Sequence, residues 1–135
     1  MKVEMNKTAQ SLIHKAASES AEGRIHFGQV IDLLMQAGVE SYAADYRSCR
    51  TTYYMPDGAT LDVSMSDAAA GIGESFDAGA VVAAIRGAQQ GSVMYPDFKR
   101  LTMSAGCVGY NVWLAGRHVV YFGRKGESHI ERFPA

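Results

Sequence analysis

An internal repeat is the feature of this sequence that most constrains its fold. The segment MQAGVESY at residues 35–42 recurs as MSAGCVGY at residues 103–110, an offset of 68 positions without a gap. Further pairs at this offset are Phe27 with Tyr95, Leu33 with Leu101, Tyr53 with Tyr121, Tyr54 with Phe122 and Gly58 with Gly126. Because the matched residues are turn glycines and core-type positions, the repeat predicts one structural unit that occurs twice. We place the units at about residues 24–66 and 92–134, within a single domain of residues 1–135.

Each unit begins with the pattern of an amphipathic helix. Apolar residues recur at helical spacing through residues 27–35. Gly38 follows at the position where a left-handed residue ends a helix. In the second unit Pro96 suits the first helical turn, and Gly106 ends the apolar stripe. The sequence therefore predicts a helix at the start of each unit.

Two further helices are predicted outside these patterns. One lies near residues 7–18, and the other runs over about residues 78–90 with Asp77 as its N-cap. The segment SDAAAGIGESF, residues 66–76, is rich in Gly, Ala and Ser and is predicted to connect the two units.

Three short strands are predicted after the helix of each unit. In the first unit they are SYAADY, CRTTYYM and ATLDVSM, joined by a turn at Arg47-Ser48 and by Pro-Asp-Gly. In the second unit they are VGYNVWL, RHVVYFG and ESHIERF. We therefore predict an α+β domain of two tandem α-β-β-β units, with six antiparallel strands and helices packed on one face. The strand order between the units stays open.

The turns also predict which side chains share a face of the sheet. They place Asp45 opposite Arg50 and Tyr53 opposite Leu61, which gives the first unit a core face and a polar face. A set of tyrosines falls on the core face: Tyr42, Tyr53, Tyr110 and Tyr121. Buried tyrosine hydroxyls need partners, so we expect polar networks beneath the sheet.

The outer face of the second unit is more apolar than that of the first. It carries Asn111, Trp113, His118, Val120, Phe122, Ile130 and Arg132. Exposed apolar patches mark interfaces or ligand surfaces, so our hypothesis is that this face binds a second copy, another protein or a flat ligand. The alternative is that a helix of the same chain covers it.

A polar cluster is predicted on the last strand. His129 and Glu131 are two residues apart and point to one face, where the turns place them beside Tyr121 and Tyr110. A histidine and a carboxylate on one face can share a proton or hold a metal ion. The alternative is that charge on this terminal strand discourages pairing with other chains.

Composition bounds the function without assigning it. The net charge of −1 gives no reason to expect a nucleic-acid partner, and no apolar run is long enough for a membrane span. Cys49 and Cys107 lack metal-site spacing, and without a secretory signal they are interpreted as reduced thiols of a cytoplasmic protein. We assign no catalytic residue, metal ligand or cofactor. Enzymatic activity stays undecided, and the patterns favour a protein without one.

The segments AGVESY, TYYMPDG and YPDFKRLTMSAGCVGYNVWLAGRHVVYFGRKGESHIERFP together resemble a small bacterial family. It is catalogued as domain of unknown function 1398, and some of its members are labelled phage envelope protein. The resemblance covers most of the chain and implies a cytoplasmic, prophage-linked protein. It supplies no catalytic residues.

Three functions are consistent with these patterns. The first is a non-enzymatic binding or interaction module, dimeric through the face that carries Trp113. The second is a small ligand-binding protein or enzyme with a pocket near Tyr110, His118, His129 and Glu131. The third is a structural component of a phage particle, as the family label implies.

Overall fold

The computed structural model describes residues 3–65 and 71–134, and its described residues form four helices and six strands. The helices are α1 (Lys7–Ala21), α2 (Phe27–Ala37), α3 (Ala78–Gln89) and α4 (Tyr95–Ser104). The strands are β1 (Ser41–Asp45), β2 (Arg50–Tyr54), β3 (Thr60–Ser64), β4 (Cys107–Trp113), β5 (His118–Gly123) and β6 (Ser128–Arg132). The predicted α+β class is confirmed. Residues 66–70 of the predicted connection lie outside the described residues.

The six strands form one antiparallel sheet in the order β3-β2-β1-β4-β5-β6. The strand order that the sequence left open is thus set by the pairing of β1 with β4 at the centre of the sheet. The predicted neighbours Asp45–Arg50 and Tyr53–Leu61 are confirmed. The two-residue turn at Ala115-Gly116 likewise brings Trp113 opposite His118.

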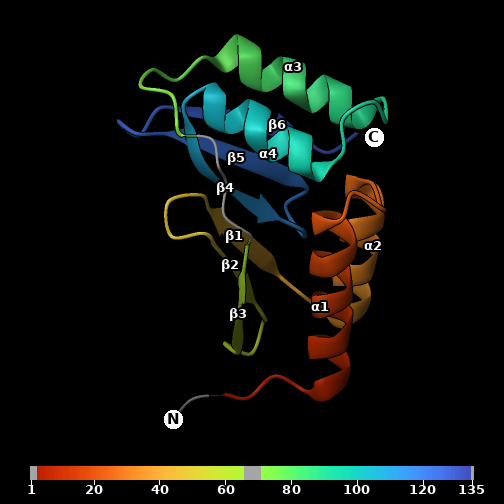
Figure 1. The fold of residues 1–135 in the computed structure, drawn as a ribbon. Helices are drawn as coiled ribbons and strands as arrows, with labels where there is room; N and C mark the ends of the chain where they lie inside the picture. Colours follow the sequence, from red (N-terminus) through yellow and green to blue (C-terminus); the bar gives the residue numbers. More distant parts are fainter. Residues whose placement is uncertain (1–2, 66–70, 135) are drawn as a thin grey trace.

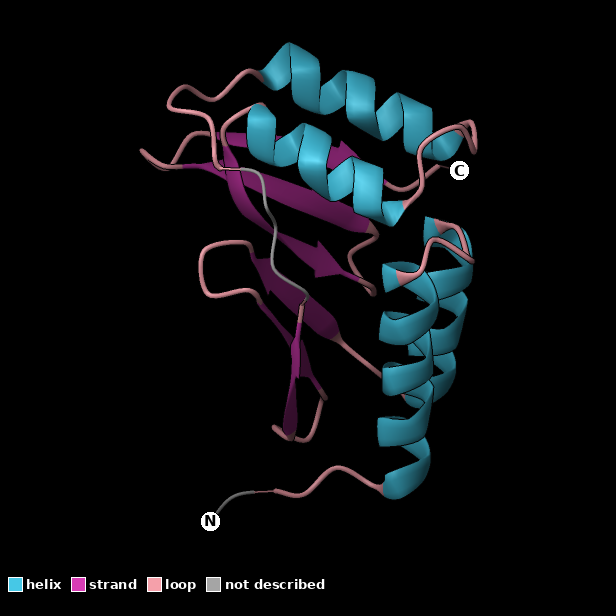
Figure 2. Ribbon diagram, viewed as in Figure 1, coloured by secondary structure: helices cyan, strands magenta, loops and turns pink. Residues whose placement is uncertain are grey.

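The helices form two antiparallel pairs on one side of the sheet (Figures 1 and 2). The pair α3–α4 lies over β4–β6, and the pair α1–α2 stands beside the half of the sheet that contains β1–β3. The two pairs meet where α1 contacts α4. Side chains from all four helices and from one sheet face build the core.

Local sequence signals account for the helix ends. The carboxylate of Asp77, the predicted N-cap, accepts a hydrogen bond from the Ala80 amide at 3.0 Å. The Asn6 side chain does the same for α1 by accepting from the Ala9 amide at 2.8 Å. Gly38 ends α2 with φ +85°, in the left-handed region that the sequence pattern required.

The backbone shows the offset of 68 more clearly than the sequence does. Every residue with positive φ in the described part of the chain has a counterpart 68 positions away. The pairs are Gly23 (φ 70°) with Gly91 (81°), Gly38 (85°) with Gly106 (87°), Cys49 (56°) with Arg117 (56°), and Gly58 (92°) with Gly126 (82°). The order of elements, two helices followed by three strands, also occurs twice. These matches support the repeat and extend it to α1 and α3.

A buried hydrogen bond joins the two halves. The hydroxyls of Tyr46 and Thr102 lie 2.8 Å apart, and the Thr102 hydroxyl also lies within hydrogen-bonding distance of the Phe98 carbonyl at 2.9 Å. Thr102 is wholly buried, and Tyr46 is 2% exposed. A buried hydroxyl that loses its partner costs free energy, so this contact should matter to stability.

We expect Thr102→Val to lower the free energy of unfolding by about 1–3 kcal/mol, because it leaves the Tyr46 hydroxyl without a partner. Urea unfolding measures the loss. Thr102→Ser keeps the hydroxyl and should lose less. In a Tyr46→Phe background Thr102→Val should cost less than in the parent, and an equal cost in both backgrounds would show that the hydrogen bond is not responsible.

Candidate functional site

A row of aromatic side chains crosses the helix-covered face of the sheet. Tyr53 on β2 stacks on Tyr42 of β1 with ring centres 5.3 Å apart, and Tyr110 on β4 lies 5.6 Å from Tyr121 on β5. An edge contact of 6.4 Å between Tyr42 and Tyr110 joins these pairs at the centre. His129 on β6 stacks on Tyr121 at 6.4 Å. The row exists because each of these residues faces the next across a strand pair or a diagonal.

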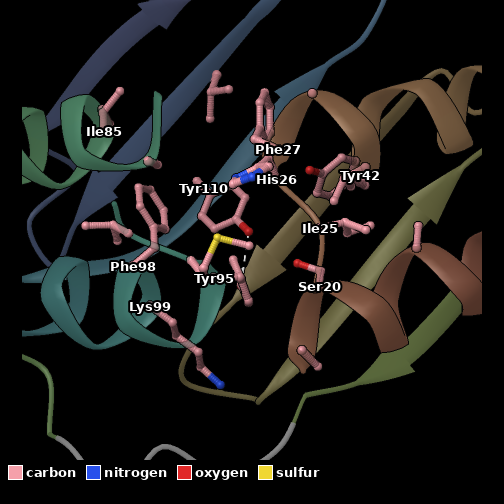
Figure 3. A pocket seen from close by; sticks show the side chains of 18 of the residues that line it. Ser20, Ile25, His26, Phe27, Tyr42, Ile85, Tyr95, Phe98, Lys99 and Tyr110 are labelled. Atoms are coloured by element: carbon pink, nitrogen blue, oxygen red, sulfur yellow. Dashed lines mark hydrogen bonds between the residues drawn. The ribbon is translucent and has the colours of Figure 1, made fainter. Parts of the chain in front are cut away.

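A cavity of about 650 Å³ lies above this row, between the two helix pairs. Apolar side chains form most of its wall, and they come from α1, α2, α3, α4 and the sheet. Figure 3 shows Ser20, Tyr42, Phe98 and Tyr110 around the same space. His26 and Gln90 also line it and are exposed, so the cavity opens to solvent near the start of α2 and the end of α3.

Two of the tyrosine hydroxyls at the cavity are already engaged. The Tyr110 hydroxyl donates to the Tyr95 hydroxyl at 3.0 Å, and Tyr95 donates to the sulfur of Met65 at 3.6 Å. Burial raises the pKa of Tyr95 to about 12, so the chain of hydroxyls stays protonated at neutral pH. This is a polar network of the kind expected beneath the sheet.

Three other tyrosine hydroxyls in the row have no hydrogen-bond partner among the described residues. Tyr42, Tyr53 and Tyr121 are 5%, 5% and 6% exposed, and all three line the cavity. Among the described residues none of these hydroxyls makes a hydrogen bond, yet no fully enclosed side-chain oxygen or nitrogen lacks a partner. Their hydroxyl oxygens are therefore not fully enclosed, and the cavity is a surface that all three residues share. For these three, the expected polar network is absent.

Glu131 belongs to an ionic network at the edge of the cavity. One carboxylate oxygen lies 2.8 Å from Arg86 Nη1 on α3, and the other lies 3.2 Å from His129 Nε2. Burial works against ionisation, but the hydrogen bonds from Arg86 and His129 outweigh it and lower the pKa of Glu131. The network ties α3 to β6.

The four residues of the predicted polar cluster lie together. Tyr110, Tyr121 and Glu131 line the cavity, and His129 contacts both Tyr121 and Glu131. His118, which the predicted pocket added to this cluster, does not join them. It lies on the opposite face of the sheet, stacked on Trp113 with ring centres 6.5 Å apart, because residues that alternate along β5 point to opposite faces. The described residues hold no group of three or more His, Cys, Asp or Glu side chains placed for a metal ion.

The predicted outer face lies on the side of the sheet away from the helices. Trp113 is 41% exposed and Ile130 is 56% exposed. Asn111, His118, Val120 and Phe122 are half-buried, and Arg132 is exposed. No described helix covers Trp113, and binding by this face stays a prediction.

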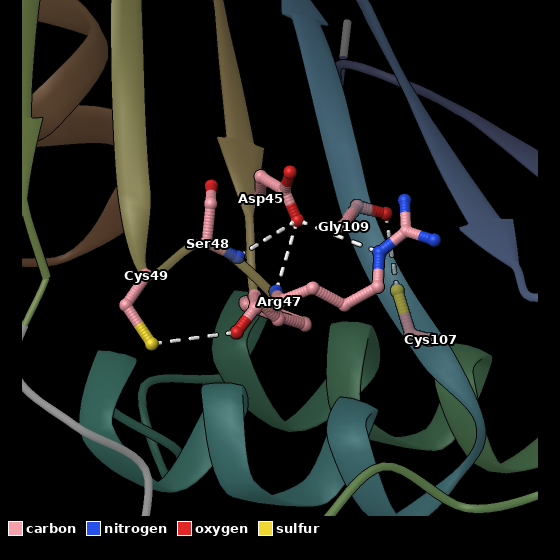
Figure 4. Close-up of polar contacts among 7 residues, drawn as sticks. Asp45, Arg47, Ser48, Cys49, Cys107 and Gly109 are labelled. Atoms are coloured by element: carbon pink, nitrogen blue, oxygen red, sulfur yellow. Dashed lines mark hydrogen bonds and ion pairs between the residues drawn. The ribbon is translucent and has the colours of Figure 1, made fainter.

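The two cysteines occupy structural positions near the turn between β1 and β2 (Figure 4). The Cys49 thiol donates to the Tyr46 carbonyl at 3.5 Å, and the Cys107 thiol donates to the Gly109 carbonyl at 3.2 Å. Burial raises the pKa of the Cys107 thiol, which disfavours the reactive thiolate. In the same turn the Asp45 carboxylate accepts from the Arg47 amide at 2.9 Å.

Sequence reasoning offered a pocket near Tyr110, His118, His129 and Glu131 as an alternative, but it did not predict the extent or the walls of this cavity. The face pattern identified its floor, but the helices that form its walls had no predicted position relative to the sheet. One signal was available: four tyrosines on the core face bring more hydroxyls than a closed core readily satisfies. Each of the described helices is too short or too polar to cross a membrane.

Comparison with known proteins places residues 27–131 within a family described as "Protein of unknown function (DUF1398)". The chain is also similar to uncharacterized proteins of Mycobacterium tuberculosis and Mycobacterium bovis. Each is 29% identical over 111 residues, which cover 81% of this chain and 67% of the relative. These matches support the family resemblance, and the phage label that some members carry stays an expectation.

Proposed function

The chain belongs to the DUF1398 family, and we propose that it is a binding protein that encloses a small, mainly apolar molecule between its helix pairs and its sheet. The observation that carries this proposal is the cavity of about 650 Å³ with unpartnered tyrosine hydroxyls in its floor. Ligand sites typically measure roughly 300–1,000 Å³ and combine apolar walls with a few polar groups.

The size of the cavity supports a function because ordinary cores do not retain such space. Protein interiors pack as densely as organic crystals, and unfilled volume costs stability. Residues around the cavity are nevertheless small at positions where larger side chains would fill it. Ala16, Ala17 and Ala21 of α1 and Ala88 of α3 all line it. The chain thus keeps space that larger apolar residues could occupy.

Binding accounts for the lining better than catalysis does. Glu131 is the one carboxylate among the described lining residues, and it already pairs with Arg86 and His129. The two cysteines lie away from the lining. The remaining polar groups are hydroxyls, amides and basic side chains, which orient a ligand without requiring a reaction.

We expect Ala88→Phe to weaken binding of the neutral fluorescent probe N-phenyl-1-naphthylamine at least about tenfold, because the added ring occupies space that the probe needs. Probe titration followed by emission intensity measures the affinity. The same substitution buries additional apolar surface, so the free energy of unfolding should stay equal or rise.

Ala83→Phe is the matched control. Ala83 lies on the same helix, is exposed and does not line the cavity. It should bind the probe like the parent. Equal affinity of the Ala88→Phe variant and the parent, or no probe binding by the parent, would contradict the proposal.

A further inference from the structure

We infer, resting on the proposed function, that the cavity selects an uncharged molecule with a hydrogen-bond acceptor such as a carbonyl oxygen, and that hydroxyls from the set Tyr42, Tyr53 and Tyr121 donate to it. The proposal names the chemical class of the ligand and the residues that recognise its polar group.

The position of the hydroxyls supports their role in recognition. Tyr42 and Tyr53 are directly paired across β1 and β2, so they form one stacked pair in the cavity floor. Tyr121 belongs to the equivalent pair on β4 and β5, whose other member, Tyr110, is engaged with Tyr95. Figure 3 shows the hydroxyl of Tyr42 directed into the space that the Ser20 hydroxyl also faces. The ligand therefore meets donors at both ends of the row.

The hydroxyls lack an acceptor, and this favours an acceptor on the ligand. A phenol can donate one hydrogen bond and can also accept. All three tyrosines are more than nine-tenths buried as residues, and their hydroxyls lie among mainly apolar side chains, so an acceptor on the ligand that bonds to them favours binding. A carbonyl oxygen satisfies a donor and has two lone pairs, so one such group can serve neighbouring hydroxyls.

The surroundings favour an uncharged ligand. The wall around the hydroxyls is mainly apolar, and a buried charge without a dedicated partner is costly. Glu131 adds a negative charge to the lining, and its Arg86 partner is committed to it. Lys99 also lines the cavity but already has an interaction within the chain, so an anionic ligand would meet the Glu131 carboxylate without a dedicated cationic partner.

Three probes of similar shape test the inference. 2-Acetylnaphthalene carries the acceptor, 2-isopropylnaphthalene replaces the carbonyl with an apolar group, and 2-naphthoate carries a charge. Their affinities are measured by displacement of N-phenyl-1-naphthylamine from the full chain. The parent should bind 2-acetylnaphthalene more tightly than 2-naphthoate.

The decisive variant is the triple substitution Tyr42→Phe, Tyr53→Phe and Tyr121→Phe. It should lower the affinity for 2-acetylnaphthalene, relative to 2-isopropylnaphthalene, at least about fivefold. Since these hydroxyls make no hydrogen bond to the described part of the chain, the variant should fold like the parent, and the single substitutions provide the same test with less change. Tyr54→Phe is the matched control, because Tyr54 neighbours Tyr53 on β2 but points to the outer face.

The outcomes separate the inference from the proposed function. If both neutral probes bind and the substitutions leave their relative affinity unchanged, the role of the three hydroxyls is overturned while cavity binding stands. Tighter binding of 2-naphthoate than of 2-acetylnaphthalene overturns the selection for an uncharged ligand. If the parent binds neither neutral probe, the proposed function itself fails.

Discussion

Replacing Gly106 with alanine is expected to lower the free energy of unfolding by about 2–5 kcal/mol. Gly106 follows α4 with φ +87°, where an L-residue costs about 1–2 kcal/mol. An added Cβ would also overlap the Ser75 carbonyl oxygen and would lie 2.6 Å from the Ser75 carbonyl carbon. These neighbours are backbone atoms and cannot rotate away, so the segment before α3 would have to move, at a cost of about 1–3 kcal/mol.

The repeat supplies the control for this prediction. Gly38 is the counterpart of Gly106 and has nearly the same φ, +85°, but an added Cβ there would only contact the end of Met55 at 3.6 Å. Gly38→Ala should therefore lose only the conformational part, about 1–2 kcal/mol. Urea unfolding of both variants measures the difference. Equal losses would show that contact with Ser75 contributes nothing.

The local elements of this fold could be predicted because their causes are local. Asp77 caps a helix, Gly38 ends one, and Pro-Asp-Gly turns one strand into the next, so each signal acts over a few residues. The registers within each half followed from turn length alone, as Asp45 opposite Arg50 shows. Sequence reasoning was therefore reliable wherever the chain returns on itself within a short loop.

The pairing of β1 with β4 could not be predicted because no turn connects these strands. The register is centred on Ala43 opposite Asn111, two positions that differ by 68. A pairing with this centre is what a local two-fold relation between the halves requires. The repeat implies such symmetry in principle, but it is compatible with many symmetric arrangements of two units.

At some positions the two halves carry side chains of different chemistry. Thr102 stands at the position that Leu34 occupies in the first half, and both are wholly buried. The Thr102 hydroxyl is hydrogen-bonded to the hydroxyl of Tyr46, which is far away in the sequence. The pattern of apolar residues along the helix therefore gives no reason to expect a threonine at this position. The extent of the candidate site could not be predicted for the same reason. Its floor belongs to the strands, but the space above the floor depends on how the two helix pairs pack against them.

Leu34→Ala is the second substitution with a large expected effect, a loss of about 2–5 kcal/mol in the free energy of unfolding. Leu34 lies on α2, is wholly buried and belongs to the core cluster. Removing most of its side chain deletes apolar contacts and leaves a void that the surrounding helices and sheet fill only in part. Urea unfolding measures the loss, and the neighbouring Met35→Ala is the control, since Met35 is 57% exposed.

The same variant tests whether the native cavity is a site or merely loose packing. Leu34 does not line the cavity, so Leu34→Ala should destabilise the fold while its folded form binds N-phenyl-1-naphthylamine like the parent. Ala88→Phe should do the opposite and lose the probe without losing stability. The contrary result is that the Leu34→Ala variant binds the probe more tightly than the parent. The probe would then bind to the new void, and probe binding would report packing defects and not a ligand site. The opposite effects of the two substitutions would show that the residues that stabilise this fold are distinct from those that keep space for a ligand.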